Sequence, residues 1–165
     1  MIYTFLNFFS GKNITNILLL CFSLSIISSC SKENEEDTFV RLTVNGEQIT
    51  TSEANFTVGD RSDFNGDIDA SFTGNGGTAT RVFSWNNNLS TADYNADITA
   101  TTDGSFQIIV KDAEGLTVLD RTIIGGAEPD SIDGVTANGA PGIWTVTIVA
   151  TNFNGDGSFS LSAGD

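Results

Sequence analysis

The sequence has 165 residues, enough for one domain of ordinary size, and 21 acidic residues against seven basic ones. A surface with a formal net charge of −14 repels phosphate backbones, so the composition argues against nucleic acid as a partner and leaves cations open. The chain has no histidine and only two cysteines, which excludes Ser-His-Asp and Cys-His catalysis, a disulfide framework and a thiolate zinc site.

The first notable segment is an apolar run from Ile14 to Ile27. Its 14 residues are short for a bilayer, which needs about 20. Lys12 and the free amine supply positive charge in front of it. This pattern predicts the apolar centre of a secretory signal peptide covering residues 1–29, with a buried helix as the alternative.

The run ends at Ile27-Ser28-Ser29-Cys30, which resembles the lipobox of bacterial lipoproteins: an aliphatic residue, two small residues and a cysteine. The resemblance implies that the Cys30 sulfur is alkylated by diacylglycerol and that Cys30 becomes the acylated first residue. Three acyl chains would hold the chain in a membrane, because each buried methylene contributes about 0.8 kcal/mol. Cleavage before Cys30 removes Lys12 and leaves 21 acids and six bases, a side-chain net charge of −15.

Residues 30–37 follow as lipidated Cys30 and an acidic tether, and residues 38–165 are expected to form a single domain. The segment Ser31–Asp37 resembles the lysine-plus-acidic tethers that direct some Gram-negative lipoproteins to the cell surface. The resemblance implies lipid anchoring in the outer membrane with display on the surface. A plain flexible spacer, with the domain facing the periplasm, is the alternative.

From Thr38 onward, short segments alternate apolar and polar residues and predict antiparallel strands. The expected inward-facing residues are Ile68, Ala70, Phe72, Tyr94, Ala96, Ile98, Ala100, Phe106, Ile108, Val110, Trp144, Val146, Ile148, Ala150, Phe159 and Leu161. Asn45-Gly46 predicts a two-residue hairpin turn, Gly115 a turn in the left-handed conformation, and 153–159 a turn that joins the last two strands. The fold class expected is an all-β antiparallel β-sandwich, whose architecture resembles jelly-roll and immunoglobulin-like extracytoplasmic modules.

Two acidic segments are candidate Ca²⁺ sites, because Ca²⁺ prefers six to eight oxygen ligands. The second segment resembles the front half of an EF-hand loop without its closing glutamate. In both segments the alternative is that Asx and Gly residues make turns and the acids stay solvated. The candidate ligands are Asp60, Asp63, Asn65, Asp67 and Asp69 in the first segment, and Asn152, Asn154 and Asp156 in the second.

Two further positions are candidate sites. Trp85 borders three asparagines and is the best candidate for an exposed aromatic that stacks on sugar rings, with a core position as the alternative. Asp130-Ser131-Ile132 resembles the Asp-Ser/Thr-aliphatic sites that some Gram-negative bacteria O-glycosylate at the hydroxyl, here that of Ser131, with a plain loop as the alternative.

Together these features favour a lipid-anchored binding or adhesion module without catalysis, stabilised by Ca²⁺, that binds a glycan or another surface protein. The alternative is a carbohydrate-binding accessory lipoprotein of a glycan-uptake system. A small hydrolase is disfavoured, because glycosidases need two carboxylates about 5–10 Å apart in a cleft and no pair of acids stands out in the sequence.

Overall fold

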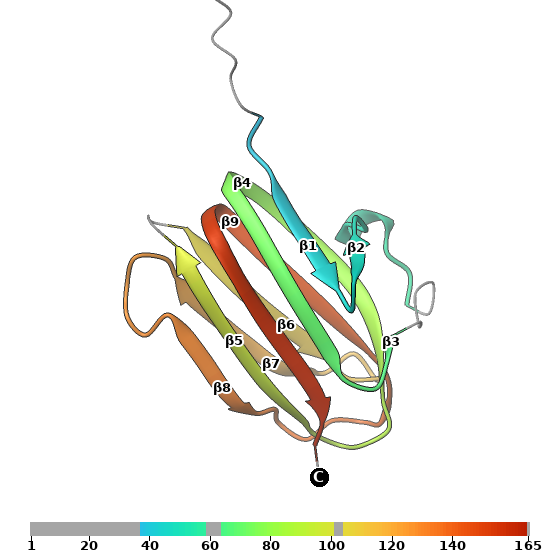
Figure 1. Ribbon diagram of the computed structural model, residues 1–165. Helices are drawn as coiled ribbons and strands as arrows, with labels where there is room; N and C mark the ends of the chain where they lie inside the picture. The colour runs from blue at the N-terminus through green and yellow to red at the C-terminus, as the bar shows by residue number, and fades with distance from the viewer. Residues whose placement is uncertain (1–36, 59–63, 101–103, 165) are drawn as a thin grey trace, which may run out of the picture. The chain divides into compact units, whose positions relative to one another are not determined.

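The computed structural model describes residues 37–58, 64–100 and 104–164. These residues form one all-β unit (Figure 1), with a single 3-10 turn, η2 (Glu53–Asn55). Within the described ranges no helix is long and apolar enough to cross a membrane. The strands are β1 (Val40–Val44), β2 (Glu47–Ile49), β3 (Phe64–Asn65), β4 (Ile68–Asn87), β5 (Ala92–Ala100), β6 (Ser105–Lys111), β7 (Thr117–Ile124), β8 (Ser131–Val135) and β9 (Gly142–Ala163).

The strands form two layers that share β4 and β9. In the first sheet, the strand order is β2-β1-β4-β9-β5-β8, with the first half of β4 and the second half of β9 at its centre. In the second sheet the order is β3-β4-β9-β6-β7, with the other halves of the two long strands at its centre. All pairs are antiparallel except the short pair of β3 with β4. The predicted antiparallel β-sandwich is confirmed.

Glycines mark the region where the two long strands pass from one sheet to the other. The register between β4 and β9 shifts twice next to Gly77. On β9, Asn152 has a positive φ of 47° and Gly155 a φ of 154°, and a Cβ on Gly155 would overlap the Thr99 carbonyl oxygen. The prediction that 153–159 is a turn is therefore wrong: these residues continue β9, and glycine serves a close backbone approach there.

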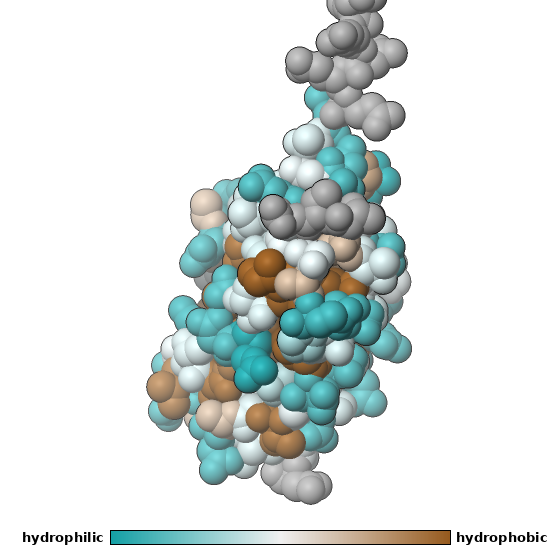
Figure 2. Space-filling model, turned by 90° about the vertical axis from the view of Figure 1, so that its left-hand side faces the viewer, coloured by the Kyte–Doolittle hydropathy of each residue, from teal (hydrophilic) through white to brown (hydrophobic). Residues whose placement is uncertain are grey.

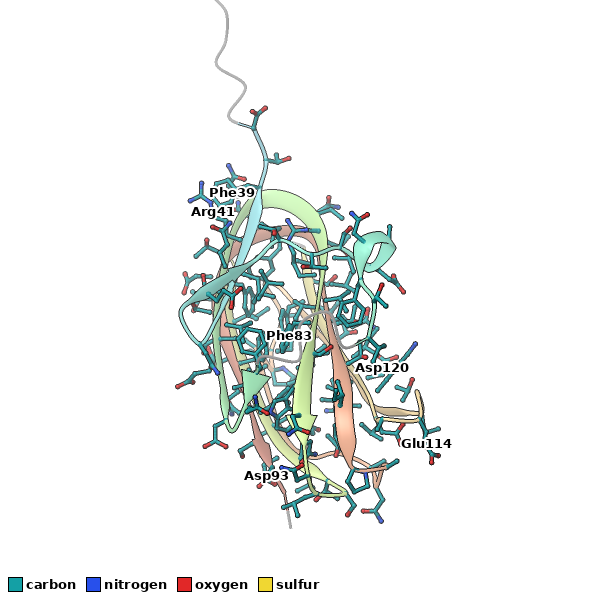
Figure 3. The ribbon with its side chains drawn as sticks, turned by 90° about the vertical axis from the view of Figure 1, so that its right-hand side faces the viewer. Phe39, Arg41, Phe83, Asp93, Glu114 and Asp120 are labelled. Carbon is teal, nitrogen blue, oxygen red and sulfur yellow. The ribbon has the colours of Figure 1, made fainter. Side chains whose placement is uncertain are left out.

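The core lies between the two sheets and follows the predicted alternation. Fifteen of the 16 residues expected to face inward are buried, and Ala100 packs against the core from a partly buried position. Figure 3 shows Phe83 between the layers, whereas Asp93 and Asp120 point to the outside. Phe72 and Phe106 stack with ring centroids 4.4 Å apart, which joins the first sheet to the second across the core.

Two predicted turns are confirmed. Asn45 and Gly46, which connect β1 to β2, both have positive φ values, 48° and 83°. Gly115 has a φ of 84° in the turn between β6 and β7. The same turn is held by Asp112, whose Oδ1 accepts the backbone N–H groups of Glu114 and Leu116.

Candidate functional site

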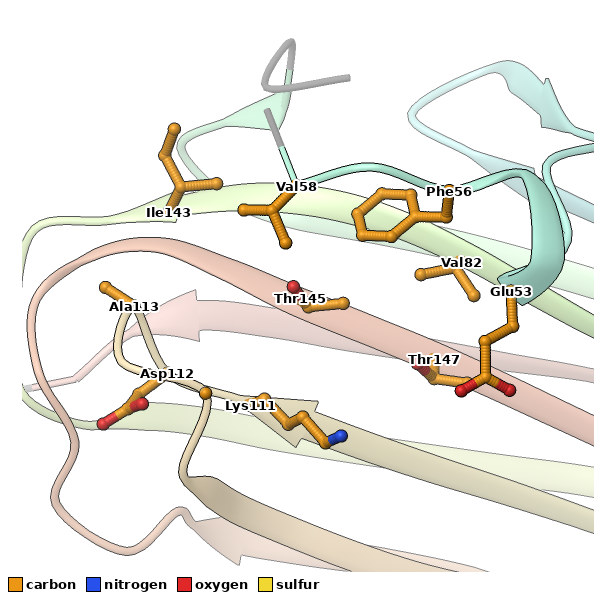
Figure 4. Close-up of a pocket in the computed structure, with 11 residues that line it drawn as sticks. Glu53, Phe56, Val58, Val82, Lys111, Asp112, Ala113, Ile143, Thr145 and Thr147 are labelled. Carbon is orange, nitrogen blue, oxygen red and sulfur yellow. The ribbon is translucent and has the colours of Figure 1, made fainter. Parts of the chain in front are cut away.

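A cavity of about 270 Å³ lies on the outer face of the second sheet (Figure 4). Its floor comes from the three central strands: Val82 on β4, Ile143, Thr145 and Thr147 on β9, and Lys111 on β6. The opposite wall is formed by η2 and the segment that follows it toward β3. Its lining residues are Glu53, Phe56 and Val58.

The segment 51–58, here called the strap, crosses the outer face of the second sheet. Its first residue, Thr51, accepts the backbone N–H of Val82 at 3.0 Å. Figure 4 shows Phe56 and Val58 projecting from the strap toward the strands that carry Val82 and Thr145. Because the strap covers this face, four consecutive residues of β4, 82–85, are buried, where a strand with one solvated face would bury every second residue.

The cavity combines apolar and polar groups. Phe56 is half-buried and Val58 is 63% exposed, so both offer apolar surface at the mouth. No hydrogen bond or ion pair within the described part of the chain engages the side chains of Glu53, Lys111 or Thr147. The cavity therefore offers an ammonium group, a carboxylate and a hydroxyl beside an aromatic ring.

Asp112 also lines the cavity, but both oxygens of its carboxylate accept backbone N–H groups, from its own turn and from the segment before β9. Oδ2 accepts the backbone N–H of Ala140 at 2.7 Å, and Oδ1 accepts two N–H groups of the turn itself. The hydrogen bond from Ala140, followed by those from Leu116 and Glu114, lowers the pKa of Asp112 although burial opposes this. Among the described lining residues, Glu53 is thus the one carboxylate free to contact a ligand, and no catalytic pair of carboxylates is formed.

Trp85 is not the exposed stacking residue that the sequence suggested. It is 1% exposed, its indole N–H donates to the Gly66 carbonyl oxygen at 2.7 Å, and its ring packs edge-to-face with Trp144 at a centroid distance of 5.9 Å. The stacking prediction is wrong because β4 turns Trp85 into the core, together with Phe83, while the strap covers the opposite face.

The first calcium candidate lies at the start of β4, and two of its residues, Asp60 and Asp63, fall outside the described residues. The Asn45 amide N–H donates to the Asp67 carbonyl oxygen, and the Asn45 side-chain oxygen accepts the backbone N–H of Asp69. Asn65, on β3, accepts the Asn86 amide N–H at 3.1 Å. The described contacts of this segment are thus turn and strand contacts.

The second calcium candidate lies on β9, in the region where the strand passes between the sheets. Asn152 is engaged by Thr78, because its backbone N–H donates to the Thr78 hydroxyl. Asn154 and Asp156 are exposed along the strand. Within the ranges that the structure describes, no group of three or more acidic, cysteine or histidine side chains is placed to hold a metal ion. Calcium binding stays a prediction.

The remaining predicted positions are placed as follows. Ser131 is exposed at the first residue of β8, an edge strand of the first sheet, so the plain-loop alternative is wrong and its modification stays a prediction. Cys30 lies outside the described residues.

Figure 2 shows one side of the molecule, where small hydrophobic areas lie scattered among hydrophilic ones. The large exposed apolar side chains are distributed over different segments: Val58, Leu89, Leu116, Ile124 and Val135.

The cavity residues were not predicted from the sequence, although two signals point to them. Val82 directly precedes Phe83, so two apolar residues in succession occupy opposite faces of β4, which indicates cover on both faces. Phe56 is an isolated aromatic in an otherwise polar stretch. The positions of Glu53 and Lys111 carry no such signal, because charged residues on a strap and at a strand end are common on any surface.

Comparison with solved structures finds distant similarity to carbohydrate-binding modules, at low sequence identity. No protein-family model and no curated protein matches the sequence. A carbohydrate-binding module described as CBM4 is 15% identical, with a TM-score of 0.33 over 58% of this chain and 79% of that one. The C-terminal CBM6 of LamC, a laminarinase from Zobellia galactanivorans, is 8% identical, with a TM-score of 0.36 over 76% and 99%. A family 11 carbohydrate-binding module from Clostridium thermocellum, in complex with a β-1,3-1,4-mixed-linked tetrasaccharide, is 12% identical, with a TM-score of 0.31 over 77% and 88%.

Proposed function

We propose that this protein is a non-catalytic carbohydrate-binding lipoprotein, which binds glycan in the cavity between the strap and the second sheet. The observation that carries the proposal is the lining of the cavity. An aromatic ring, Phe56, stands beside an ammonium, a carboxylate and a hydroxyl that no described residue engages: Lys111, Glu53 and Thr147. A ligand site typically joins an apolar surface to a few polar groups in this way.

A sugar ring matches this lining because it is amphipathic. Its C–H faces pack against an aromatic ring, and its hydroxyls both donate and accept hydrogen bonds. Lys111 can only donate and ionised Glu53 can only accept, so a hydroxyl-bearing ligand can satisfy both. The opposite charges also leave the cavity without a strong preference for an ionic ligand. The volume of about 270 Å³ is near the lower end of ligand pockets, which suits one or two sugar units.

The experiment is affinity gel electrophoresis of the purified full-length protein in gels that contain mixed-linkage β-1,3-1,4-glucan, laminarin, β-1,4-galactan or xylan. We expect retardation by at least one polysaccharide, and Phe56→Ala should weaken it about tenfold or more. Phe39→Ala is the matched control, because Phe39 is a partly buried aromatic outside the cavity that stacks with the guanidinium of Arg41 at 4.5 Å. Lack of retardation in all four gels, or equal retardation of wild type and Phe56→Ala, contradicts the proposal.

The second part of the proposal concerns location. The lipobox at Cys30 and the acidic tether support a protein that is anchored by diacylglycerol and fatty acids in the outer membrane of a Gram-negative bacterium and displayed on its surface. Metabolic labelling with a fatty-acid probe is expected to label the wild type and not Cys30→Ala. Protease added to intact cells should remove the domain if it is displayed. Labelling of Cys30→Ala contradicts the anchor, and protection from protease contradicts display.

A further inference from the structure

Ser84 stands out among the buried polar residues of the described chain. It is 0% exposed, and its hydroxyl oxygen has no hydrogen-bond partner. The other three are satisfied: Asn87 donates to the Thr91 carbonyl oxygen, Asp112 accepts three N–H groups, and the Thr136 hydroxyl accepts the N–H of Ala92. Buried polar groups are nearly always paired, because an unpaired one loses its hydration without replacement.

The position of Ser84 connects this hydroxyl with the cavity. Ser84 is flanked on β4 by two core residues, Phe83 and Trp85, so its side chain points to the outer face of the second sheet. On that face it lies between Val82 and Asn86, directly opposite Thr145 on β9. Val82 and Thr145 line the cavity, as does Ile143, which is opposite Asn86. Ser84 therefore belongs to the floor over which the strap passes.

The two ends of the strap differ in their hydrogen bonds to this floor. Its first residue is fixed by the hydrogen bond from Val82 to Thr51. From Phe56 to Val58 the described chain has no backbone hydrogen bond to the second sheet, and Val58 is 63% exposed. Within the described chain, moving residues 56–58 away from the floor breaks no backbone hydrogen bond to the sheet, which costs less than breaking a strand pair such as that of β3 with β4.

We propose that Ser84 is a specificity-determining residue of the glycan site: the strap moves at Phe56–Val58, and a ligand hydroxyl then hydrogen-bonds the Ser84 hydroxyl. This inference rests on the proposed function, since it adds a deeper contact to the same cavity. Ser84 would select a sugar whose free hydroxyl extends past Phe56 and reaches the floor of the cavity. A substituted sugar at this position leaves Ser84 unpaired and binds more weakly.

The first test compares Ser84→Ala with the wild type in the four polysaccharide gels, with melting temperature measured in parallel. We expect about a tenfold loss of affinity, the effect of one hydrogen bond, and an unchanged or higher melting temperature because no protein contact is removed. Ser158→Ala, an exposed serine on the outer face of the first sheet, is the matched control and should change neither. A Ser84→Ala protein that binds like the wild type, or that melts at a lower temperature with unchanged affinity, overturns the inference while the proposed function stands.

The second test needs no ligand and asks whether movement of the strap exposes residue 84 to solvent. In a chain with Cys21→Ser and Cys30→Ser, the thiol of Ser84→Cys should react with a thiol reagent at least tenfold faster than that of Ala92→Cys, which is buried in the core at 0% exposure. Equal rates mean that the floor is reached only by global unfolding, and they overturn the inference whether or not glycan binds. Lack of retardation in every gel overturns the inference together with the proposed function.

Discussion

The outer faces of the two sheets are built from strands with the same alternation, but they differ in what covers them. On the first sheet, Ser71, Ser158, Asp97 and Ser131 are neighbours across four strands, and all are exposed. On the second sheet, the corresponding row contains Val82, which is 1% exposed beneath the strap. The first face is a solvated polar surface, whereas the second has become the floor of a cavity. A short covering segment, rather than the sheet itself, thus creates the candidate site.

The largest expected effect separates the inner from the outer side of a single strand. Trp144→Ala removes a fully buried ring that packs on Trp85 and whose N–H donates to Ala140, and should cost about 3–5 kcal/mol of unfolding free energy. Thr145→Ala, at the next residue and on the outer face, should cost less than about 1 kcal/mol. Urea unfolding followed by circular dichroism measures both. Similar costs for the two substitutions contradict the assigned orientation of β9.

A charge placed on each outer face tests the comparison directly. Val82→Asp puts a carboxylate at a position that is 1% exposed under the strap and should cost about 2–4 kcal/mol. Ser71→Asp puts the same group on the open face of the first sheet and should change stability by about 0.5 kcal/mol or less. Equal effects in urea unfolding would mean that the strap leaves the second face as solvated as the first.

Acid should weaken the turn at the cavity wall. The pKa of Asp112 is lower in the folded protein than the ordinary value of about 3.9, mainly because of the hydrogen bond from Ala140. Its contribution to stability is therefore complete above about pH 5 and is lost as the pH falls through the lowered value. Asp112→Asn should be less stable at pH 7 and lose less stability between pH 5 and pH 3. Asp93→Asn, at an exposed aspartate, is the control, and parallel pH profiles for wild type and Asp112→Asn contradict this role.

The smallest expected effect concerns cations at the acidic segment that leads into β4. If Asp60 to Asp69 bind Ca²⁺ only in the folded state, millimolar Ca²⁺ should raise the melting temperature by about 2–4 °C more than Mg²⁺ at matched ionic strength. Replacing both Asp67 and Asp69 with Asn should abolish the difference. Equal shifts with the two ions would leave screening of the net charge as the explanation.

The comparison also explains what the sequence could predict. Alternation in five segments identified the inner faces of four strands, β4, β5, β6 and β9, because the side that a residue faces follows the pattern of its own strand, as Ile108 and Val146 illustrate. The asparagines beside Trp85 suggested exposure, whereas Trp85 shares the inner face of β4 with Phe83 and is buried. The prediction of a turn at 153–159 failed because glycine and asparagine favour turns and equally allow two backbones to approach closely. The strap was not predicted, because its path depends on contacts made only in the folded molecule.

The two central strands have a consequence for the order in which the chain can fold. β9 is the last described strand and lies at the centre of both sheets, paired with β4, β5 and β6. A nascent chain that ends before Gly142 has neither sheet complete, and the contacts between β4 and β9 close a loop of more than fifty residues. Folding thus waits until synthesis has passed the final strand. Until then β4, β5 and β6 lack the strand that pairs with all three, so a shorter chain exposes the apolar faces that these strands bury in the complete sandwich.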